Sequence, residues 1–391
     1  MPPTPGSPFK AGLYVHFPFC RRKCPYCHFK SIPVDAHLLR SHVVAWRKAL
    51  LVEAEMLAAG VAGPLPLDLE FDTLYIGGGT PSLITGEELG DLRKDLAARL
   101  PLRPVEFTLE ANPIANAGPE TFRAWIRAGV TRLSVGVQSF DDDVLRTLGR
   151  DVPAGRIEEF LLLAREAGFG SLALDFMVGI PGETPGSIDR TIETVRRLVP
   201  DHVSVYFMEN IEGLPMEQVV RENPVDEDET VDAFDRMAAA LAAMGRPRYE
   251  ISNFARPGRE CQHNLKYWRY EPFFGLGPSA ASHFGGKRWT NTRDIEAWRL
   301  GALNGSIPLS ETVPLPPETA AREALAAGLR LVGGLDLDVF AERFGFDPMF
   351  FLRKRIDELD GDGLIERTGR VLRIPETMLN VSNQIIARLL D

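Results

Sequence analysis

The sequence of 391 residues is poor in cysteine and has no long apolar run. Four cysteines are too few for a disulfide scaffold. No run reaches the roughly 18 uncharged apolar residues of a membrane-spanning helix, and the N-terminus lacks the apolar segment of a secretory signal. With 44 Lys and Arg against 54 Asp and Glu, the net charge of −10 disfavours nucleic acid as a partner. A cytoplasmic protein is expected.

The first half of the chain alternates short β-rich runs with stretches of helical spacing. The expected strands are 13–17, 72–78, 105–111, 132–139, 171–179 and 202–207. The expected helices are 36–59, 86–99, 119–128, 141–168 and 186–198. This alternation predicts βα units and a parallel sheet, hence an α/β fold. Six such units are compatible with an open sheet or with a partial barrel.

The second half has a different composition. A helix is expected at 228–244, followed by a segment rich in glycine and aromatics at 267–289 and a proline-rich linker at 306–319. Further helical runs and a hairpin at 364–374 predict a small winged-helix-like unit; the runs are 318–332, 337–344 and 349–360. We therefore divide the chain into 1–210, 211–310 and 311–391.

Three cysteines crowd into one loop directly after the first expected strand. Cys20, Cys24 and Cys27 have the spacing C-x3-C-x2-C. Three thiolates can hold three irons of a [4Fe–4S] cluster and leave the fourth iron open to an external ligand. The alternative is a zinc site completed by His28 or by the distant Cys261. The spacing favours the cluster.

Polar residues and glycines follow the next expected strands. Gly77, Gly78 and Gly79 precede Thr80, and glycines let backbone N–H groups approach a ligand closely. Three further polar residues, Glu110, Gln138 and Asp175, lie at or near the ends of the third, fourth and fifth strands. Parallel sheets build their sites at these carboxyl ends, so the residues are expected to converge.

These motifs together resemble one branch of the radical S-adenosylmethionine (SAM) superfamily, which contains the coproporphyrinogen dehydrogenase HemN and its relative HemW. The matching pieces are YVHFPFC, GGGTPS, EANP, SVGVQSF, LGR and GIPGET. The resemblance implies a partial (β/α)6 radical SAM barrel with a C-terminal α+β extension and a winged-helix-like domain. It implies a cluster on the three cysteines and SAM contacts from Tyr14, Gly78, Gly79, Thr80, Glu110, Gln138, Arg150 and Asp175. The chain departs from the branch at Asp151-Val152, where relatives usually have a histidine.

Three features are more similar to HemW-type haem chaperones than to the dehydrogenase. Phe29 stands where the dehydrogenase has a fourth motif cysteine, and only 19 residues precede Cys20. The segment HNLKYW matches the H-N-x-x-Y-W motif that HemW-like proteins associate with haem binding. The resemblance therefore implies His263 as a haem ligand, with Cys261 and His283 as alternatives.

The expected function is a haem chaperone that binds haem, a [4Fe–4S] cluster and SAM, and passes haem to an acceptor such as a haem-dependent respiratory enzyme. Any peripheral membrane contact would come through the acceptor. The chain is expected to be a monomer or a homodimer. It is expected to lack coproporphyrinogen dehydrogenase activity. Three alternatives remain open. They are oxygen-independent decarboxylation of coproporphyrinogen III, anaerobic opening of haem, and a zinc-stabilised binding protein without enzymatic activity.

Overall fold

Six parallel strands form the centre of the molecule. The computed structural model describes residues 8–61, 63–113 and 117–390, so residues 1–7, where no secretory signal is expected, lie outside it. The strands are adjacent in chain order: β1 (Phe9–Phe17), β4 (Leu69–Gly78), β5 (Leu102–Ala111), β6 (Arg132–Gln138), β7 (Ser171–Val178) and β8 (His202–Phe207). Each coincides with an expected strand, which confirms the α/β fold.

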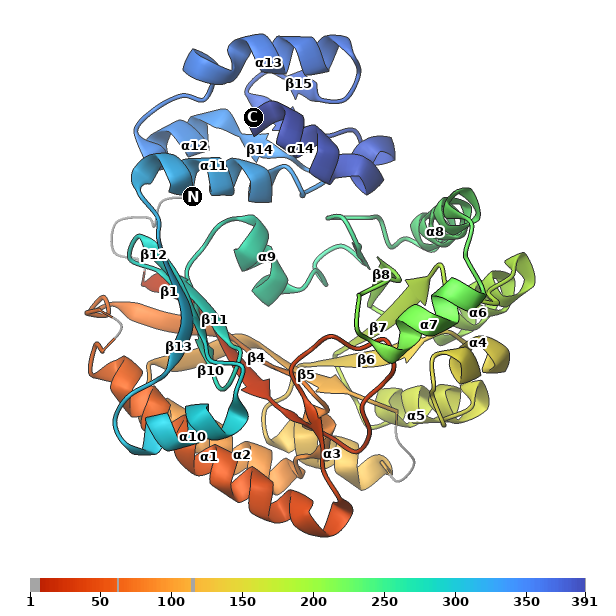
Figure 1. The fold of residues 1–391 in the computed structure, drawn as a ribbon, viewed down its shortest axis with the longest axis vertical. Coiled ribbons are helices and arrows are strands. Elements are labelled where there is room, and N and C mark those ends of the chain that lie inside the picture. Colours follow the sequence, from red (N-terminus) through yellow and green to blue (C-terminus); the bar gives the residue numbers. More distant parts are fainter. Residues whose placement is uncertain (1–7, 62, 114–116, 391) are drawn as a thin grey trace.

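The connecting helices cover the outer face of this curved sheet (Figure 1). They are α1 (Ala36–Ala58), α2 (Gly86–Ala97), α3 (Pro119–Arg127), α4 (Asp142–Thr147), α5 (Ala154–Glu166) and α6 (Pro185–Leu198). The expectation of one helix over 141–168 is wrong, because the chain turns between α4 and α5. Gly149 has φ 67° in this turn, and Pro153 stands immediately before α5.

Residues after β8 extend the same sheet at both edges. Strand β9 (Asn253–Ala255) pairs with β8, and β10 (Phe273–Leu276) lies parallel to β1. Beyond β10 follow β11 (Ala281–Phe284), β12 (Lys287–Asn291) and β13 (Leu309–Pro314). The expected linker at 306–319 is wrong in its centre, because β13 pairs antiparallel with β12 along its length. The accompanying helices are α7 (Pro215–Glu222), α8 (Glu227–Ala243), α9 (Gln262–Trp268) and α10 (Ile295–Leu303).

The C-terminal residues form a small unit with its own apolar core, at the top of Figure 1. Its helices are α11 (Pro317–Gly328), α12 (Leu337–Phe344), α13 (Met349–Gly361) and α14 (Ser382–Leu390). Its three-stranded sheet contains β14 (Leu335–Asp336), β16 (Val371–Arg373) and β15 (Glu366–Thr368) in that order. Helices with a hairpin agree with the expected winged-helix-like unit. No described helix is both long and apolar enough to cross a membrane.

Helix α1 ties the central strands to the extension. Trp46 packs edge-on against Phe17 of β1, with ring centroids 5.2 Å apart. About two turns further on, the buried Glu53 accepts hydrogen bonds from Gly277 N, Asn291 Nδ2 and Trp298 Nε1 at 2.6–2.9 Å. Burial raises the pKa of Glu53 to about 7. One carboxyl group thus connects α1 with the β10–β11 turn, β12 and α10.

Candidate functional site

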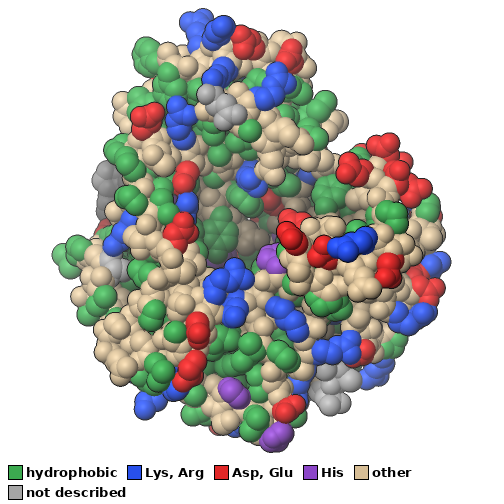
Figure 2. Space-filling view, viewed as in Figure 1, with side chains coloured by type: hydrophobic (Ala, Val, Ile, Leu, Met, Phe, Trp, Pro, Cys, Tyr) green, Lys and Arg blue, Asp and Glu red, His purple; other side chains and the backbone are tan. Residues whose placement is uncertain are grey.

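A cavity of about 420 Å³ opens along the concave face of the six parallel strands. Figure 2 shows a hollow in the middle of the molecule, below the C-terminal unit. The residues around this cavity include all three motif cysteines and most of the expected SAM contacts. Those present are Cys20, Cys24, Cys27, Gly78, Gly79, Thr80, Glu110, Gln138, Arg150 and Asp175. Residues from six separate segments are therefore brought together as the sequence predicts.

The cysteine loop is fixed at its base and along its side. Two short strands, β2 (Phe19–Cys20) and β3 (Ile32–Pro33), pair to close it, and Thr80 Oγ1 lies 3.4 Å from Cys20 Sγ. Arg22 donates to the carboxylate of Asp151 and to the carbonyl of Gly149. Asp151, where the chain departs from the family pattern, thus contacts the loop. Burial raises the pKa of the Cys27 thiol.

The glycine segment at the end of β4 combines a left-handed backbone with close packing. Gly78 has φ 112°, and a Cβ there would lie 2.5 Å from the ring of His16. Its N–H donates to Glu110 Oε2 at 2.9 Å, and Tyr75 OH donates to Glu110 Oε1 at 2.9 Å. Burial raises the pKa of Glu110 to about 7. The segment therefore orients Glu110 as well as exposing backbone to the cavity.

Side chains from β6 and β7 form the opposite wall. Burial raises the pKa of Asp175, which accepts a hydrogen bond from Ser134 Oγ at 3.3 Å. Gln138 ends β6 in the left-handed region, with φ 73°. Arg150 Nη2 donates to the carbonyl of Gly136 at 2.5 Å. The wall thus offers carboxyl, amide and guanidinium groups to one ligand.

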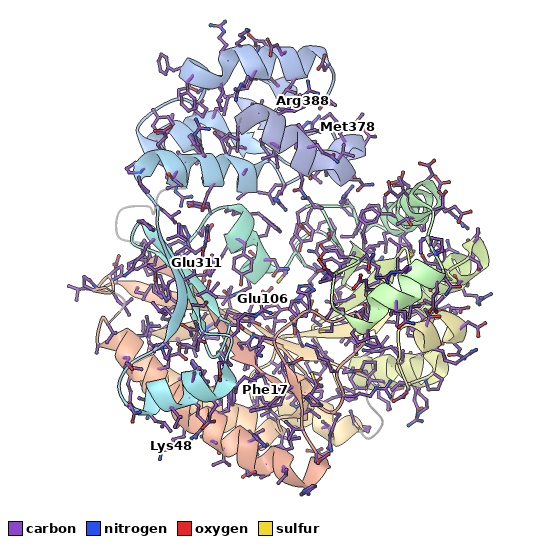
Figure 3. The ribbon with its side chains drawn as sticks, in the orientation of Figure 1. Phe17, Lys48, Glu106, Glu311, Met378 and Arg388 are labelled. Carbon is purple, nitrogen blue, oxygen red and sulfur yellow. The ribbon has the colours of Figure 1, made fainter. Side chains whose placement is uncertain are left out.

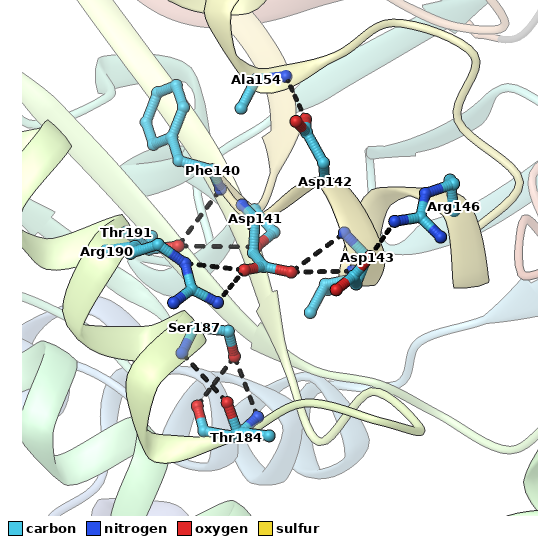
Figure 4. A network of polar contacts seen from close by, with 12 residues as sticks. Phe140, Asp141, Asp142, Asp143, Arg146, Ala154, Thr184, Ser187, Arg190 and Thr191 are labelled. Carbon is cyan, nitrogen blue, oxygen red and sulfur yellow. Dashed lines mark hydrogen bonds and ion pairs between the residues drawn. The ribbon is translucent and has the colours of Figure 1, made fainter.

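A polar network holds the turn that follows Gln138 (Figure 4). Asp141 accepts from the backbone N–H groups of Asp143 and Val144 and so caps α4. The same carboxylate pairs with Arg190 of α6 at 2.8 Å through Nε, and Thr191 Oγ1 accepts from Phe140 N at 3.1 Å. Because the turn is fastened to two helices, the unusual backbone conformation of Gln138 is held in place.

Tyr14, an expected SAM contact, is not among the described residues that surround the cavity. Its hydroxyl lies 3.0 Å from His16 Nδ1, and its ring stacks obliquely on Tyr75. His16 Nε2 lies 2.7 Å from the carbonyl of Lys30. A carbonyl only accepts, so Nε2 carries the proton and Nδ1 accepts from Tyr14. The pair therefore connects β1 to the end of the cysteine loop.

His263 is buried in α9, which packs inside the curved sheet. Its side chain is 1% exposed, with Nδ1 2.8 Å from Thr73 Oγ1 and Nε2 2.9 Å from Tyr267 OH. Glu106 accepts from the backbone N–H groups of Gln262 and His263 at 3.0 Å and caps the helix. Figure 3 shows Glu106 beside α9 in the centre of the molecule. In this arrangement both ring nitrogens of His263 are hydrogen-bonded, so the expected coordination of haem iron would require one of these contacts to open.

The two alternative haem ligands occupy different surroundings. Cys261 is buried, its thiol lies 3.5 Å from Glu106 Oε1, and burial raises its pKa to about 12. It is not among the described residues around the cavity, so it does not join the other three cysteines. His283 on β11 is half-buried against Tyr270, with ring centroids 4.3 Å apart. The motif reaches the cavity through Asn264.

Several residues around the cavity were not anticipated from the motifs. They include Tyr75, Arg132, Ser134, Ser204 and Tyr206. Side-chain alternation along β6 could have identified two of them. Positions 132, 134, 136 and 138 share one face of this strand, so Arg132 and Ser134 lie on the same face as Gln138. Which face turns inward depends on the curvature of the sheet, and that is set by tertiary packing.

Comparisons with known proteins agree with this geometry. The Radical SAM superfamily matches residues 14–195, and the HemN C-terminal domain matches residues 315–377. The protein named heme chaperone HemW from Mycobacterium tuberculosis is 34% identical over 371 residues, covering 94% of this chain and 91% of its own. That from Bacillus subtilis is 31% identical, covering 96% and 98%. The chain belongs to the HemW family of radical SAM proteins.

A mitochondrial relative and a solved structure extend the comparison. The radical S-adenosyl methionine domain-containing protein 1 of Bos taurus is 32% identical over 413 residues, covering 100% of this chain and 89% of its own. The structure of coproporphyrinogen III oxidase HemN from Escherichia coli superposes with a TM-score of 0.84 at 21% identity, covering 98% and 90%. This likeness confirms the radical SAM fold.

Family membership also bears on the cofactors. Radical SAM proteins take a [4Fe–4S] cluster and SAM, which confirms the expected pair at the level of the family. The residues fit: three thiols lie at one cavity whose walls carry carboxyl, amide and guanidinium groups. His28 also lines this cavity, but a zinc site is not what the superfamily implies.

Proposed function

We propose that this chain is a haem chaperone that binds haem, a [4Fe–4S] cluster and SAM, and transfers haem to an acceptor protein. The observation that carries the proposal is the convergence of the three motif cysteines and the polar strand ends on one cavity. The names of its relatives, haem chaperones from several bacteria, supply the cargo. Phe29, 57% exposed at the cavity, stands where the dehydrogenase motif has a cysteine.

Different residues around the cavity would hold different groups of SAM. Cys20, Cys24 and Cys27 would hold the cluster, and the cluster would supply an open iron for the amino and carboxylate groups of SAM. Glu110 and Asp175, carboxyl groups whose pKa values burial raises, suit ribose hydroxyls and the ammonium group.

Haem binding through His263 carries a conformational requirement. Coordination needs one bare ring nitrogen, and both nitrogens now contact hydroxyl groups. Burial lowers the pKa of His263 to about 3, so the imidazole is neutral and has a lone pair once a contact opens. We propose that α9 moves away from Thr73 or that Tyr267 swings aside when haem binds. Otherwise His283, which is half-buried, is the alternative.

The remaining parts of the proposal concern the setting of the transfer. The acceptor is a haem-dependent protein, for which a respiratory enzyme is the expected example, and the chaperone acts in the cytoplasm as a monomer or homodimer. Cell fractionation would test the location of the protein, and analytical sedimentation would test its oligomeric state. Transfer of haem to candidate acceptor proteins would test the identity of the acceptor.

The cluster and SAM assignments are tested by anaerobic reconstitution. Wild-type protein should take up about four irons per chain. Cys24→Ala should abolish the cluster, whereas the matched Cys261→Ala should keep it, because Cys261 lies away from the cavity. Asp175→Ala and Glu110→Ala should keep the iron and lose SAM affinity. Stoichiometric zinc without iron uptake, or normal SAM binding by both carboxyl variants, would contradict the proposal.

A further inference from the structure

Helix α9 lies between the central sheet and the C-terminal unit (Figure 1). At its amino end, Glu106 of β5 accepts from the backbone N–H groups of Gln262 and His263. At its carboxyl end, Tyr267 covers Nε2 of His263, and the helix contacts α11 of the C-terminal unit. The two ends of α9 are therefore held by different parts of the fold.

An arginine of the C-terminal unit binds the carboxyl end of α9. Arg343 of α12 donates from Nη1 to the carbonyl of Arg269 at 2.9 Å and from Nη2 to the carbonyl of Tyr270. Its guanidinium carbon lies 5.6 Å from the centre of the Tyr270 ring. A cation at this end of a helix gives partners to the last carbonyls and complements the helix dipole. Arg343 thus holds the two residues that follow α9.

Tyr270 makes a second contact with the same unit. Its hydroxyl donates to Glu323 Oε2 of α11 at 2.9 Å, and Arg288 of β12 donates to both oxygens of that carboxylate at 2.8–2.9 Å. The Tyr270 ring also packs against the apolar core of the C-terminal unit. Its backbone has φ 54°, which is unusual for a residue with a side chain and needs support from its surroundings. The C-terminal unit therefore sets the conformation of the turn after α9.

Both candidate haem ligands lie beside this turn. Tyr270 N donates to the carbonyl of Tyr267, whose hydroxyl lies 2.9 Å from His263 Nε2. The ring of His283 packs on the ring of Tyr270, with centroids 4.3 Å apart. A displacement of the turn would therefore move the groups that cover both histidines.

We infer that Arg343, Tyr270 and Glu323 are positioning residues for haem binding, which hold the carboxyl end of α9 closed over His263. Because Glu106 holds the amino end, release of the carboxyl end would turn the helix about His263. Tyr267 would then leave Nε2 and open that nitrogen to iron. The inference rests on the proposed function, in which a histidine of this region ligates haem.

This arrangement predicts the sign of a mutational effect. When only an open minority of molecules can bind, the observed affinity is reduced in proportion to that minority. Contacts that exist only in the closed form keep the minority small. Removal of such a contact should therefore make haem binding faster and tighter, whereas removal of a group that touches haem should make it weaker.

Three variants separate these contacts from their surroundings. Arg343→Met removes the guanidinium, and Arg343 lies outside the apolar core of its unit, so the unit should still fold. Tyr270→Phe keeps the ring and removes only the hydroxyl that donates to Glu323. Arg353→Met on α13 is the matched control for loss of one positive charge, because this side chain is 75% exposed and lies 3.8 Å from Asp357.

Two measurements are made on each folded variant of the reconstituted protein. Hydrogen exchange without haem reports the opening of residues 265–270. Rapid mixing with haem, followed at the Soret band, reports the rate of binding. Arg343→Met should accelerate both about tenfold, as expected for lost hydrogen bonds from a charged donor, and Tyr270→Phe should accelerate both severalfold. Arg353→Met should match wild type.

The inference is overturned if exchange and haem binding in Arg343→Met and Tyr270→Phe equal those of wild type. It is also overturned if exchange accelerates while haem binding does not, or if haem binds more slowly, because the contacts would then have only a structural role. Tyr270→Phe keeps the test decisive if Arg343→Met does not fold. Failure of the proposed function is distinguished by wild type itself, which would then give no Soret change with haem.

Discussion

Replacing His263 with alanine should destabilise the fold itself, before any ligand is added. The imidazole contacts the hydroxyls of Thr73 and Tyr267 and stacks obliquely on Tyr75, with ring centroids 5.3 Å apart. Each buried hydroxyl left without a partner costs about 1–3 kcal/mol. Loss of the packed ring adds to this. We expect the free energy of unfolding to fall by about 3–5 kcal/mol.

The same contacts predict a dependence on pH. Burial lowers the pKa of His263 from 6.5 to about 3, with smaller effects from Lys266 and Arg132. The unfolded chain takes up a proton near pH 6.5 and the folded chain does not. The stabilisation by neutral His263 is therefore complete above pH 6.5 and is lost as the pH falls towards 3, at up to about 1.4 kcal/mol per pH unit.

Denaturant unfolding of the protein without haem, measured from pH 4 to 8, is the assay. His263→Gln should flatten the acid limb relative to wild type, because the amide does not titrate. His37→Ala, at an exposed position of α1, is the control and should change stability by less than about 0.5 kcal/mol. If His263→Ala is as stable as the control, the structural role assigned to His263 is refuted.

Two further substitutions test other parts of the fold. Gly78→Ala should lower the thermal stability more than Gly168→Ala does. Both glycines have positive φ, but only at Gly78 would a Cβ collide with a side chain, the ring of His16. Equal losses of stability in the two variants would contradict this packing. Glu53→Gln should cost about 2–3 kcal/mol, because an amide oxygen cannot accept from all three donors. Since burial raises the pKa of Glu53, its stabilisation is present at pH 5 and lost as the pH rises through about 7, so the deficit should be larger at pH 5 than at pH 8.

Local sequence signals identified the parallel strands because each is a buried apolar run bounded by turn residues. The same signals failed where distant partners decide the structure. Residues 309–314 have a linker composition, yet they become β13 because β12 offers an open edge. The 141–168 stretch has continuous helical spacing, yet the turn at Gly149 ends α4 before α5 begins.

Some residues of the candidate site could likewise be predicted from the sequence, and others could not. Glu110, Gln138 and Asp175 could be predicted because parallel strands bring their carboxyl ends to one edge. Tyr14 and His263 also belong to the matching motifs, but a motif does not show in which direction a side chain points. Both are hydrogen-bonded, and neither is among the described residues around the cavity. Arg132 could not be found at a strand end, because it lies at the start of β6.

The central claim, a haem chaperone without dehydrogenase activity, is tested most directly on one anaerobic sample containing cluster and SAM. Haem should bind to the reconstituted protein and pass from it to a haem-dependent acceptor protein, as followed by the Soret band. Coproporphyrinogen III offered to the same sample with a reductant should yield no protoporphyrinogen. Multiple turnovers of decarboxylation, or haem that is neither bound nor released to an acceptor, would contradict the account.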